Sequence, residues 1–382
     1  MIKTTLTQLL TRIKSEPVLT AAALCMFLSM LFVPPTLSYI GYIDFRVLAL
    51  LFCLMAVVAG LQRHGLFHWL AQRMLTGKKR RRLLFLTLIL LPFFVSMLVT
   101  NDVALITCVP FAILVLELTG QQQYLIFVVV MQTVAANLGS MATPVGNPQN
   151  LYLYSRFALT PGSFFAAVLP YALIALAAMA GSVLFCREQE FSVTFPESER
   201  RSAADSRKDT ISIIAYLLLF ALCLLSVFHL LPYGILLGIV CAALLFLDRA
   251  LYQTLDYGLL LTFVCFFIFA GNIGAIPAVS GFLEGIMENK PLLTSALASQ
   301  VISNVPAAVL LSGFTQDWKA LLLGTDIGGL GTPIASLASL ISFRLYQKTK
   351  TANAGRYLLF FSIVNFAGLV LLLLFSFAAG LR

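Results

Sequence analysis

The fold is decided by residues 142–150, Ala-Thr-Pro-Val-Gly-Asn-Pro-Gln-Asn, which interrupt a charge-free run that extends over residues 118–155. A membrane helix needs only about 20 apolar residues, so this run is too long for one straight crossing. Pro144 and Pro148 cannot continue a regular helix, and Gly146 favours an unwound backbone. The sequence therefore predicts a transmembrane helix that is broken near its middle.

The rest of the chain has the composition of an all-α polytopic membrane protein. Of its 382 residues, 60% are hydrophobic and 11% are charged, whereas soluble domains carry about 25% charged residues. The first apolar segment is longer than the apolar region of a cleavable signal peptide, which has roughly 7–15 residues, so we do not expect it to be cleaved. Further charge-free stretches cover residues 18–43, 83–101, 157–186, 210–247, 257–283 and 357–381.

The positive charges predict the topology. Despite a net charge of +9, we expect no nucleic-acid partner, because the basic residues gather in three loops, at residues 73–82, 200–208 and 344–356. Under the positive-inside rule all three loops face the cytoplasm. This requires two segments that enter and leave the membrane on the same side. We therefore expect about nine crossings and two re-entrant hairpins in a bacterial inner membrane, with the N-terminus in the cytoplasm and the C-terminus outside.

Length also predicts the second hairpin. Its arms, residues 291–303 and 306–314, cannot span a hydrocarbon core about 30 Å thick at about 1.5 Å per residue. The polar tip Ser303-Asn304-Val305-Pro306 separates the arms, and Thr100-Asn101-Asp102 marks the corresponding tip in the first half.

Three short motifs recur in the same order in both halves of the chain. Ala59-Gly60 matches Ala270-Gly271, and Thr100-Asn101 matches Ser303-Asn304. Residues 137–145 match residues 326–334, with Thr143-Pro144 aligned to Thr332-Pro333. Repeats of this kind with broken helices are typical of secondary transporters, whose site lies near the membrane midplane.

We therefore predict two inverted repeats with the following boundaries: a cytoplasmic N-terminus (1–17), a first repeat (18–186), a basic cytoplasmic loop (187–209), a linking helix (210–231) and a second repeat (233–382). Within the repeats, the hairpins are expected at about 83–118 and 291–314, and the broken helices at about 123–155 and 318–343.

The breaks indicate where the chemistry lies. Freed backbone groups are tolerated in a membrane only inside protein or beside a polar cavity. Helix N-termini favour anions, whereas freed carbonyls and side-chain oxygens favour hard cations such as Na⁺. The candidate binding residues are Thr100, Asn101, Asp102, Asn137, Thr143, Gly146, Asn147, Asn150, Ser303, Asn304, Asp326, Thr332 and Ser336, and the helix breakers are Pro144, Pro148, Pro306 and Pro333.

Two carboxylates stand out among these residues. An ionisable group at membrane depth is costly and marks function, so Asp102 is the leading candidate for coupling. Asp102 and Asp326 have helix capping as their alternative role. We expect no structural metal and no cofactor other than a coupling H⁺ or Na⁺. Because Asp102 matches Val305 and Asn137 matches Asp326, the first repeat is expected to carry most of the polar chemistry.

Residues 100–105, 143–150 and 299–306 resemble motifs of the ion-transporter superfamily of arsenite permeases, NhaD-type antiporters, citrate transporters and divalent anion/sodium symporters. The resemblance covers most of the chain and is closest to YbiR-type anion permeases. It implies an elevator-like motion, a homodimer and, from the dicarboxylate branch, tips that bind Na⁺ and substrate. The third tip positions, Asp102 and Val305, depart from that branch, and an Asn-Asp tip is more similar to arsenite permeases.

The sequence thus predicts a secondary active transporter in the lipid bilayer that moves a small anion or oxyacid, coupled to H⁺ or Na⁺. A Na⁺/H⁺ antiporter using Asp102 and Asp326 is the main alternative, and a membrane-embedded sensor is another. The sequence contains no Walker, HExxH or GxSxG motif, so we expect neither an ATPase nor an enzyme. Because the site contains no Lys or Arg, a neutral oxyacid such as arsenite also fits it.

Overall fold

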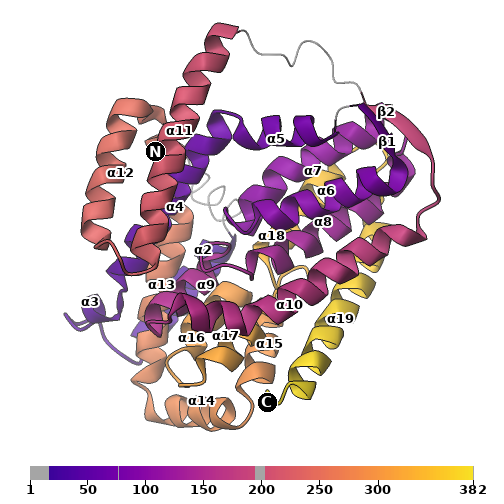
Figure 1. The fold of residues 1–382 in the computed structure, drawn as a ribbon. Coiled ribbons are helices and arrows are strands. Elements are labelled where there is room, and N and C mark those ends of the chain that lie inside the picture. Colours follow the sequence, from indigo (N-terminus) through magenta and orange to yellow (C-terminus); the bar gives the residue numbers. More distant parts are fainter. Residues whose placement is uncertain (1–16, 76, 194–202, 382) are drawn as a thin grey trace, which may run out of the picture.

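The computed structural model describes residues 17–75, 77–193 and 203–381, and within these the chain is almost entirely helical (Figure 1). Seven of the described helices are long and apolar enough to cross a membrane by length and composition. This confirms the predicted all-α polytopic fold. The predicted N-terminal segment lies almost wholly outside the described residues, as does part of the basic loop 187–209.

The first half contains α2 (Pro17–Met30), α3 (Tyr39–Tyr42), α4 (Phe45–Arg63), α5 (Leu66–Leu75), β1 (Gly77–Arg80), α6 (Arg81–Val95), α7 (Asn101–Leu118), η1 (Gln122–Tyr124), α8 (Leu125–Ser140), α9 (Pro148–Arg156), α10 (Pro161–Ser182), η2 (Val183–Phe185) and β2 (Glu190–Val193). The second half contains α11 (Ala203–Val227), α12 (Tyr233–Leu247), η4 (Arg249–Gln253), α13 (Tyr257–Gly274), α14 (Pro277–Asn289), α15 (Pro291–Ile302), α16 (Asn304–Leu311), α17 (Trp318–Ile327), α18 (Leu337–Gln347) and α19 (Ala354–Ala378).

The two halves share one order of elements: a long helix, an amphipathic helix, a helical hairpin, a broken helix and a closing helix. The series is α4, α5, α6–α7, α8–α9 and α10 in the first half, and α13, α14, α15–α16, α17–α18 and α19 in the second. The amphipathic helices α5 and α14 lie across opposite ends of the molecule (Figure 1). This arrangement is what inverted repeats require, although the orientation in a membrane stays a prediction.

The long helices α4 and α13 have equivalent residues near both of their ends. Asp44 caps α4 by accepting a hydrogen bond from the N–H of Val47 (3.0 Å), and Asp256 caps α13 through Leu259 (2.9 Å). At the other end, a Cβ on Gly60 would overlap the ring of Tyr216, and one on Gly271 would overlap Tyr42. The repeated Ala-Gly motif therefore allows a tyrosine ring to pack directly on the helix backbone.

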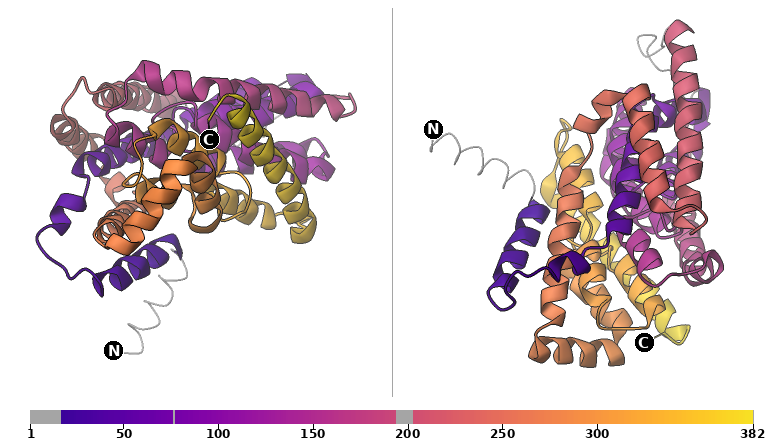
Figure 2. Two further views of the ribbon diagram at one scale, coloured as in Figure 1. Left: turned by 90° about the horizontal axis from the view of Figure 1, so that it is seen from below. Right: turned by 90° about the vertical axis from the view of Figure 1, so that its left-hand side faces the viewer.

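The helices pack in two groups. In one, α2 lies against α13, and α11 and α12 lie against α4 (Figure 2). In the other, each hairpin packs on the broken helices, with α6 on α8, α15 on α17 and α7 on α18. The two groups meet mainly where α13 contacts α16 and α4 contacts α9.

A short antiparallel sheet joins the first hairpin to the end of α10. Strand β1 pairs with β2 from Gly77 opposite Val193 to Arg80 opposite Glu190. The next residue, Arg81, is buried, donates to the carbonyl of Arg187 (2.9 Å) and stacks its guanidinium on Tyr124 at 5.1 Å. The sheet lies at the same end of the molecule as α5 and the first residues of α11 (Figure 1).

Candidate functional site

The two hairpin tips are fastened to the broken helices in the same way. The backbone N–H of Asn101 donates to the carbonyl of Gly146 (3.2 Å), and that of Asn304 donates to the carbonyl of Ala335 (3.0 Å). The side-chain Oδ1 of each asparagine accepts from the N–H of the following residue, at 3.0 and 2.9 Å. The predicted tip asparagines therefore occupy equivalent positions and hold the second arm of each hairpin.

The predicted threonines form the second matching contact. Thr143 donates its hydroxyl to the carbonyl of Met97 (2.5 Å), and Thr332 donates to the carbonyl of Gln300 (3.0 Å). Each acceptor lies four residues before the tip asparagine of its own hairpin. The Thr-Pro motif thus anchors each unwound segment to the hairpin of the same half.

Gln300 adds a clamp in the second half that the sequence analysis did not identify. Its Nε2 donates to the carbonyls of Gly328 (2.8 Å) and Leu330 (2.9 Å), and its Oε1 accepts from the N–H of Thr332 (2.9 Å). Met97 occupies the equivalent position in the first half and cannot make these bonds. Gln300 could have been identified from the sequence, because it is a polar residue at membrane depth within residues 299–306.

Asn137, at the end of α8, connects both halves. Its Oδ1 accepts hydrogen bonds from Asn101 Nδ2 (2.9 Å) and from the hydroxyl of Ser336 (3.1 Å). Its Nδ2 donates to the carbonyl of Gly329 (3.4 Å). One buried amide therefore joins the first hairpin tip to the unwound segment of the second half.

Asp326 holds the equivalent place at the end of α17. Its Oδ1 accepts from Asn147 Nδ2 (3.4 Å) and from Gln149 Nε2 (3.3 Å), both in the first half. Asn147 also caps α9, because its Oδ1 accepts from the N–H of Asn150 (3.0 Å), and Pro148 starts that helix. Gln149 was not predicted as a site residue, although it lies within the motif that decides the fold.

These contacts define a central polar cluster in which the two broken helices meet. Its members are all at most 5% exposed: Asn101, Asn137, Asn147, Gln149, Asn150, Asp326 and Ser336. Among the described residues, no Lys or Arg side chain is hydrogen-bonded to it. The cluster therefore offers amides, a hydroxyl and one carboxylate to a bound solute.

Other predicted residues shape the unwound segments. Asn150 donates to the carbonyls of Met141 (3.2 Å) and Thr143 (3.4 Å), which the helix break has freed. Gly146 leaves no room for a Cβ beside the backbone of Ser140. Ser303 adopts a left-handed conformation (φ 71°) at the second tip and donates to the carbonyl of Ala335 (3.2 Å).

The remaining predicted residues are one threonine of the first hairpin tip and three of the helix-breaking prolines. Thr100 is the N-cap residue of α7 but makes no side-chain capping bond. Pro306 lies in the first turn of α16, and Pro144 and Pro333 lie in the unwound segments of the two halves.

Asp102 follows Asn101 and donates its backbone N–H to that residue's Oδ1 (3.0 Å), but its side chain has no described hydrogen bond to the central polar cluster. It is in the first turn of α7, where its Oδ1 is buried and has no hydrogen-bond partner among the described residues. No hydrogen bond described in the structure connects its side chain to Asn137 or Asp326. The structure thus places the two predicted carboxylates in different surroundings, and the Asp326 side chain is the one with described hydrogen bonds to the opposite half.

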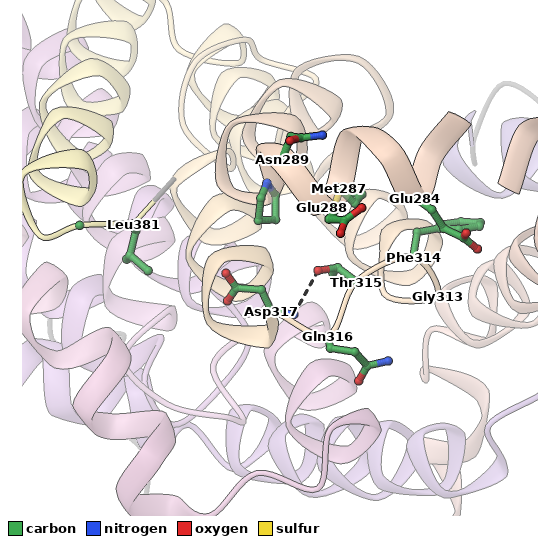
Figure 3. Close-up of a pocket in the computed structure, with 12 residues that line it drawn as sticks. Glu284, Met287, Glu288, Asn289, Gly313, Phe314, Thr315, Gln316, Asp317 and Leu381 are labelled. Carbon is green, nitrogen blue, oxygen red and sulfur yellow. Dashed lines mark hydrogen bonds between the residues drawn. The ribbon is translucent and has the colours of Figure 1, made fainter. Parts of the chain in front are cut away.

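An open cavity of about 860 Å³ lies beside α14, at one end of the molecule (Figure 3). Its lining includes the carboxylates of Glu284, Glu288 and Asp317, and Thr315 Oγ1 accepts from the N–H of Asp317 (3.0 Å). None of the predicted site residues lines it.

Comparison with known proteins agrees with this architecture. A family model described as citrate transporter (CitMHS) matches residues 9–317. The inner membrane protein YbiR of Escherichia coli is 30% identical over 319 residues, which cover 81% of this chain and 82% of YbiR. An uncharacterized transporter of Methanocaldococcus jannaschii is 29% identical over 335 residues, 87% of this chain and 90% of its own. The arsenical pump membrane protein of Yersinia enterocolitica is 27% identical over 333 residues, 78% of each chain. These matches confirm the resemblance inferred from the motifs.

Proposed function

The chain belongs to the citrate transporter (CitMHS) family, and from this premise we propose that it is a secondary active transporter for a small anion or oxyacid. The central polar cluster carries the proposal, because it buries seven polar side chains from both halves where the hairpin tips meet the broken helices. Buried polar groups at membrane depth are costly and line substrate paths in transporters.

The chemistry of the cluster favours a solute with hydroxyl groups. Amides both donate and accept hydrogen bonds, whereas an ionised Asp326 can accept hydrogen bonds but cannot donate them. Without Lys or Arg bonded to the cluster, a free anion would depend on amides, hydroxyls and helix N-termini, and it would face the Asp326 carboxylate. A small neutral oxyacid, or an anion accompanied by a cation, fits these groups better. Arsenite is the first candidate, since one similar protein is an arsenical pump membrane protein.

The packing suggests how transport proceeds. The hairpins and broken helices form one group, and α2, α4, α11, α12 and α13 form the other. We propose that the first group moves against the second in an elevator-like motion, within a homodimer in the inner membrane. The basic loops would face the cytoplasm, and H⁺ or Na⁺ would supply the energy.

Uptake into proteoliposomes tests this proposal. Purified protein is reconstituted, and arsenite, sulfate and citrate are offered with an inward Na⁺ or H⁺ gradient. We expect arsenite to accumulate. Asn137→Ala should reduce the rate about tenfold or more, because it removes three buried hydrogen bonds of about 0.6 kcal/mol each in a membrane.

The controls separate the alternatives. Ser336→Ala removes one of these bonds and should give a smaller loss, and the exposed Glu284→Gln should transport at the wild-type rate. If Na⁺ alone drives proton movement and no solute accumulates, the protein is a Na⁺/H⁺ antiporter and the oxyacid proposal is wrong. Specific binding of arsenite without uptake would indicate a sensor.

A further inference from the structure

The central polar cluster contains three buried oxygen atoms that accept no hydrogen bond from the part of the chain that the structure describes. Asp326 Oδ2, Gln149 Oε1 and Asn150 Oδ1 have no hydrogen-bond partner among the described residues. Their side chains are at most 3% exposed, so bulk water does not reach them freely. A buried polar atom without a partner destabilises a fold and needs an explanation, such as a bound ion.

The three side chains gather around one carboxylate. Gln149 Nε2 lies 3.3 Å from Asp326 Oδ1, and Asn150 follows Gln149 in the first turn of α9, where the carbonyls of Met141 and Thr143 hold its Nδ2. Asn147 and Gln149 donate to Oδ1 only, which leaves Oδ2 open. These donors orient the carboxylate in the way that surrounding hydrogen bonds orient metal ligands.

We propose that these three oxygens bind one dehydrated Na⁺ between the broken helices α9 and α17. Hard cations prefer carboxylate and amide oxygens, and one positive ion satisfies several acceptors at once. The ion would neutralise the single carboxylate of Asp326 in a region of low dielectric constant, where an isolated charge is costly. A proton on Asp326 would leave at least one of the amide oxygens without a partner.

This site keeps Asp326, which the sequence also indicated for Na⁺/H⁺ exchange, but it differs from the hairpin tips and from Asp102, the leading candidate for coupling. The hairpin-tip oxygens of Asn101 and Asn304 already accept the N–H of the following residue, and no hydrogen bond described in the structure joins the Asp102 side chain to the cluster. Because Gln149 and Asn150 belong to the first half and Asp326 to the second, Na⁺ would bridge the two repeats. The role of the ion in transport rests on the proposed function, whereas its binding does not.

Thermal unfolding of the purified full chain in detergent tests the binding. The chloride salts of Na⁺, K⁺ and choline are titrated at constant ionic strength. Because a ligand stabilises the state that binds it, we expect Na⁺ to raise the unfolding temperature in a saturable manner, and K⁺ and choline to have no such effect. Asp326→Asn should weaken the apparent Na⁺ affinity by about tenfold or more, since the carboxylate charge is lost.

Two further variants keep the test decisive. Gln149→Met retains the Asp326 carboxylate but removes one proposed ion ligand, so the Na⁺ affinity of this variant should also fall. If Asp326→Asn does not fold, Gln149→Met alone tests the Na⁺ site. Glu284→Gln removes an exposed carboxylate elsewhere and should keep the wild-type response. The site is wrong if the wild type shows no Na⁺-specific stabilisation, or if Asp326→Asn and Gln149→Met respond to Na⁺ as the wild type does.

The transport assay and the thermal-unfolding assay test separate proposals, so either proposal can be refuted without the other. Oxyacid uptake by a protein without Na⁺-specific stabilisation overturns the cation site and leaves the proposed function intact. A saturable Na⁺ response that requires Asp326, without uptake of any offered solute, supports the cation site and overturns the proposed function.

Discussion

Replacing Gln300 by alanine should loosen the second broken helix. The substitution leaves the carbonyls of Gly328 and Leu330 and the N–H of Thr332 without their side-chain partner. Each such bond contributes about 0.6–1 kcal/mol, so the loss amounts to about 2–3 kcal/mol. The unwound segment also positions Ser336, so the central polar cluster should lose its order together with stability.

Reversible unfolding in mixed detergent micelles measures the free energy, and the proteoliposome assay measures transport. Gln132→Ala is a matched control, because Gln132 is a buried glutamine whose side chain donates one bond, to the carbonyl of Leu88 (2.8 Å). It should cost about 1 kcal/mol. Gln300→Met, which copies Met97 of the first half, should behave like Gln300→Ala. The reasoning is refuted if Gln300→Ala costs no more than Gln132→Ala and transports at the wild-type rate.

Three further predictions follow from other contacts. Burial and the Arg46 guanidinium lower the pKa of His229, in the α11–α12 turn, below its ordinary value of 6.5. The unfolded chain therefore binds the proton more readily, so stability should fall as the pH drops below about 6.5, and His229→Gln should remove this component in thermal unfolding at pH 5 and pH 8. Gly60→Leu should cost about 1–3 kcal/mol by overlapping a tyrosine ring, whereas Gly238→Leu, which faces open space, should change the unfolding free energy little. The last prediction concerns the orientation in the membrane, in which the loop 344–356 faces the cytoplasm. In a cysteine-free background, Lys350→Cys should not react with an impermeant thiol reagent in intact cells, whereas a cysteine in α14 should react. The opposite pattern would contradict the predicted orientation.

The sequence contains most of the information on the fold, because the relevant signals are local. Two prolines and a glycine within residues 142–150 break a helix wherever they lie in a membrane, and the structure has α8 end at Ser140 and α9 begin at Pro148. Arm lengths likewise indicated the second hairpin, which is formed by α15 and α16. The charge-free stretch 18–43 does not form one helix: α2 ends at Met30, because an irregular turn precedes Pro34 and Pro35.

The site was predicted less completely, because its contacts join residues that are far apart in the chain. The partners Asn147 and Asp326 are separated by 179 positions, and Asn137 and Ser336 by 199. The sequence marks both Asp102 and Asp326 as carboxylates at membrane depth, and it favours Asp102 for coupling. Only the packing of α17 against α9 shows that Asp326 meets amides from the other half. Gln149 and Gln300 were missed because glutamine carries no charge and breaks no helix.

The asymmetry between the repeats has a physical reason in this geometry. Positions 137 and 326 are equivalent, and each accepts a hydrogen bond from the unwound segment of the opposite half. The first segment supplies Asn147, Gln149 and Asn150, whereas the equivalent positions of the second are Ser336, Ala338 and Ser339. A carboxylate needs several donors when it is buried, so it is better accommodated at position 326, opposite the amide-rich segment, than at position 137. The first repeat thus contributes the amides and the second the charge, and neither half contains the cation site alone.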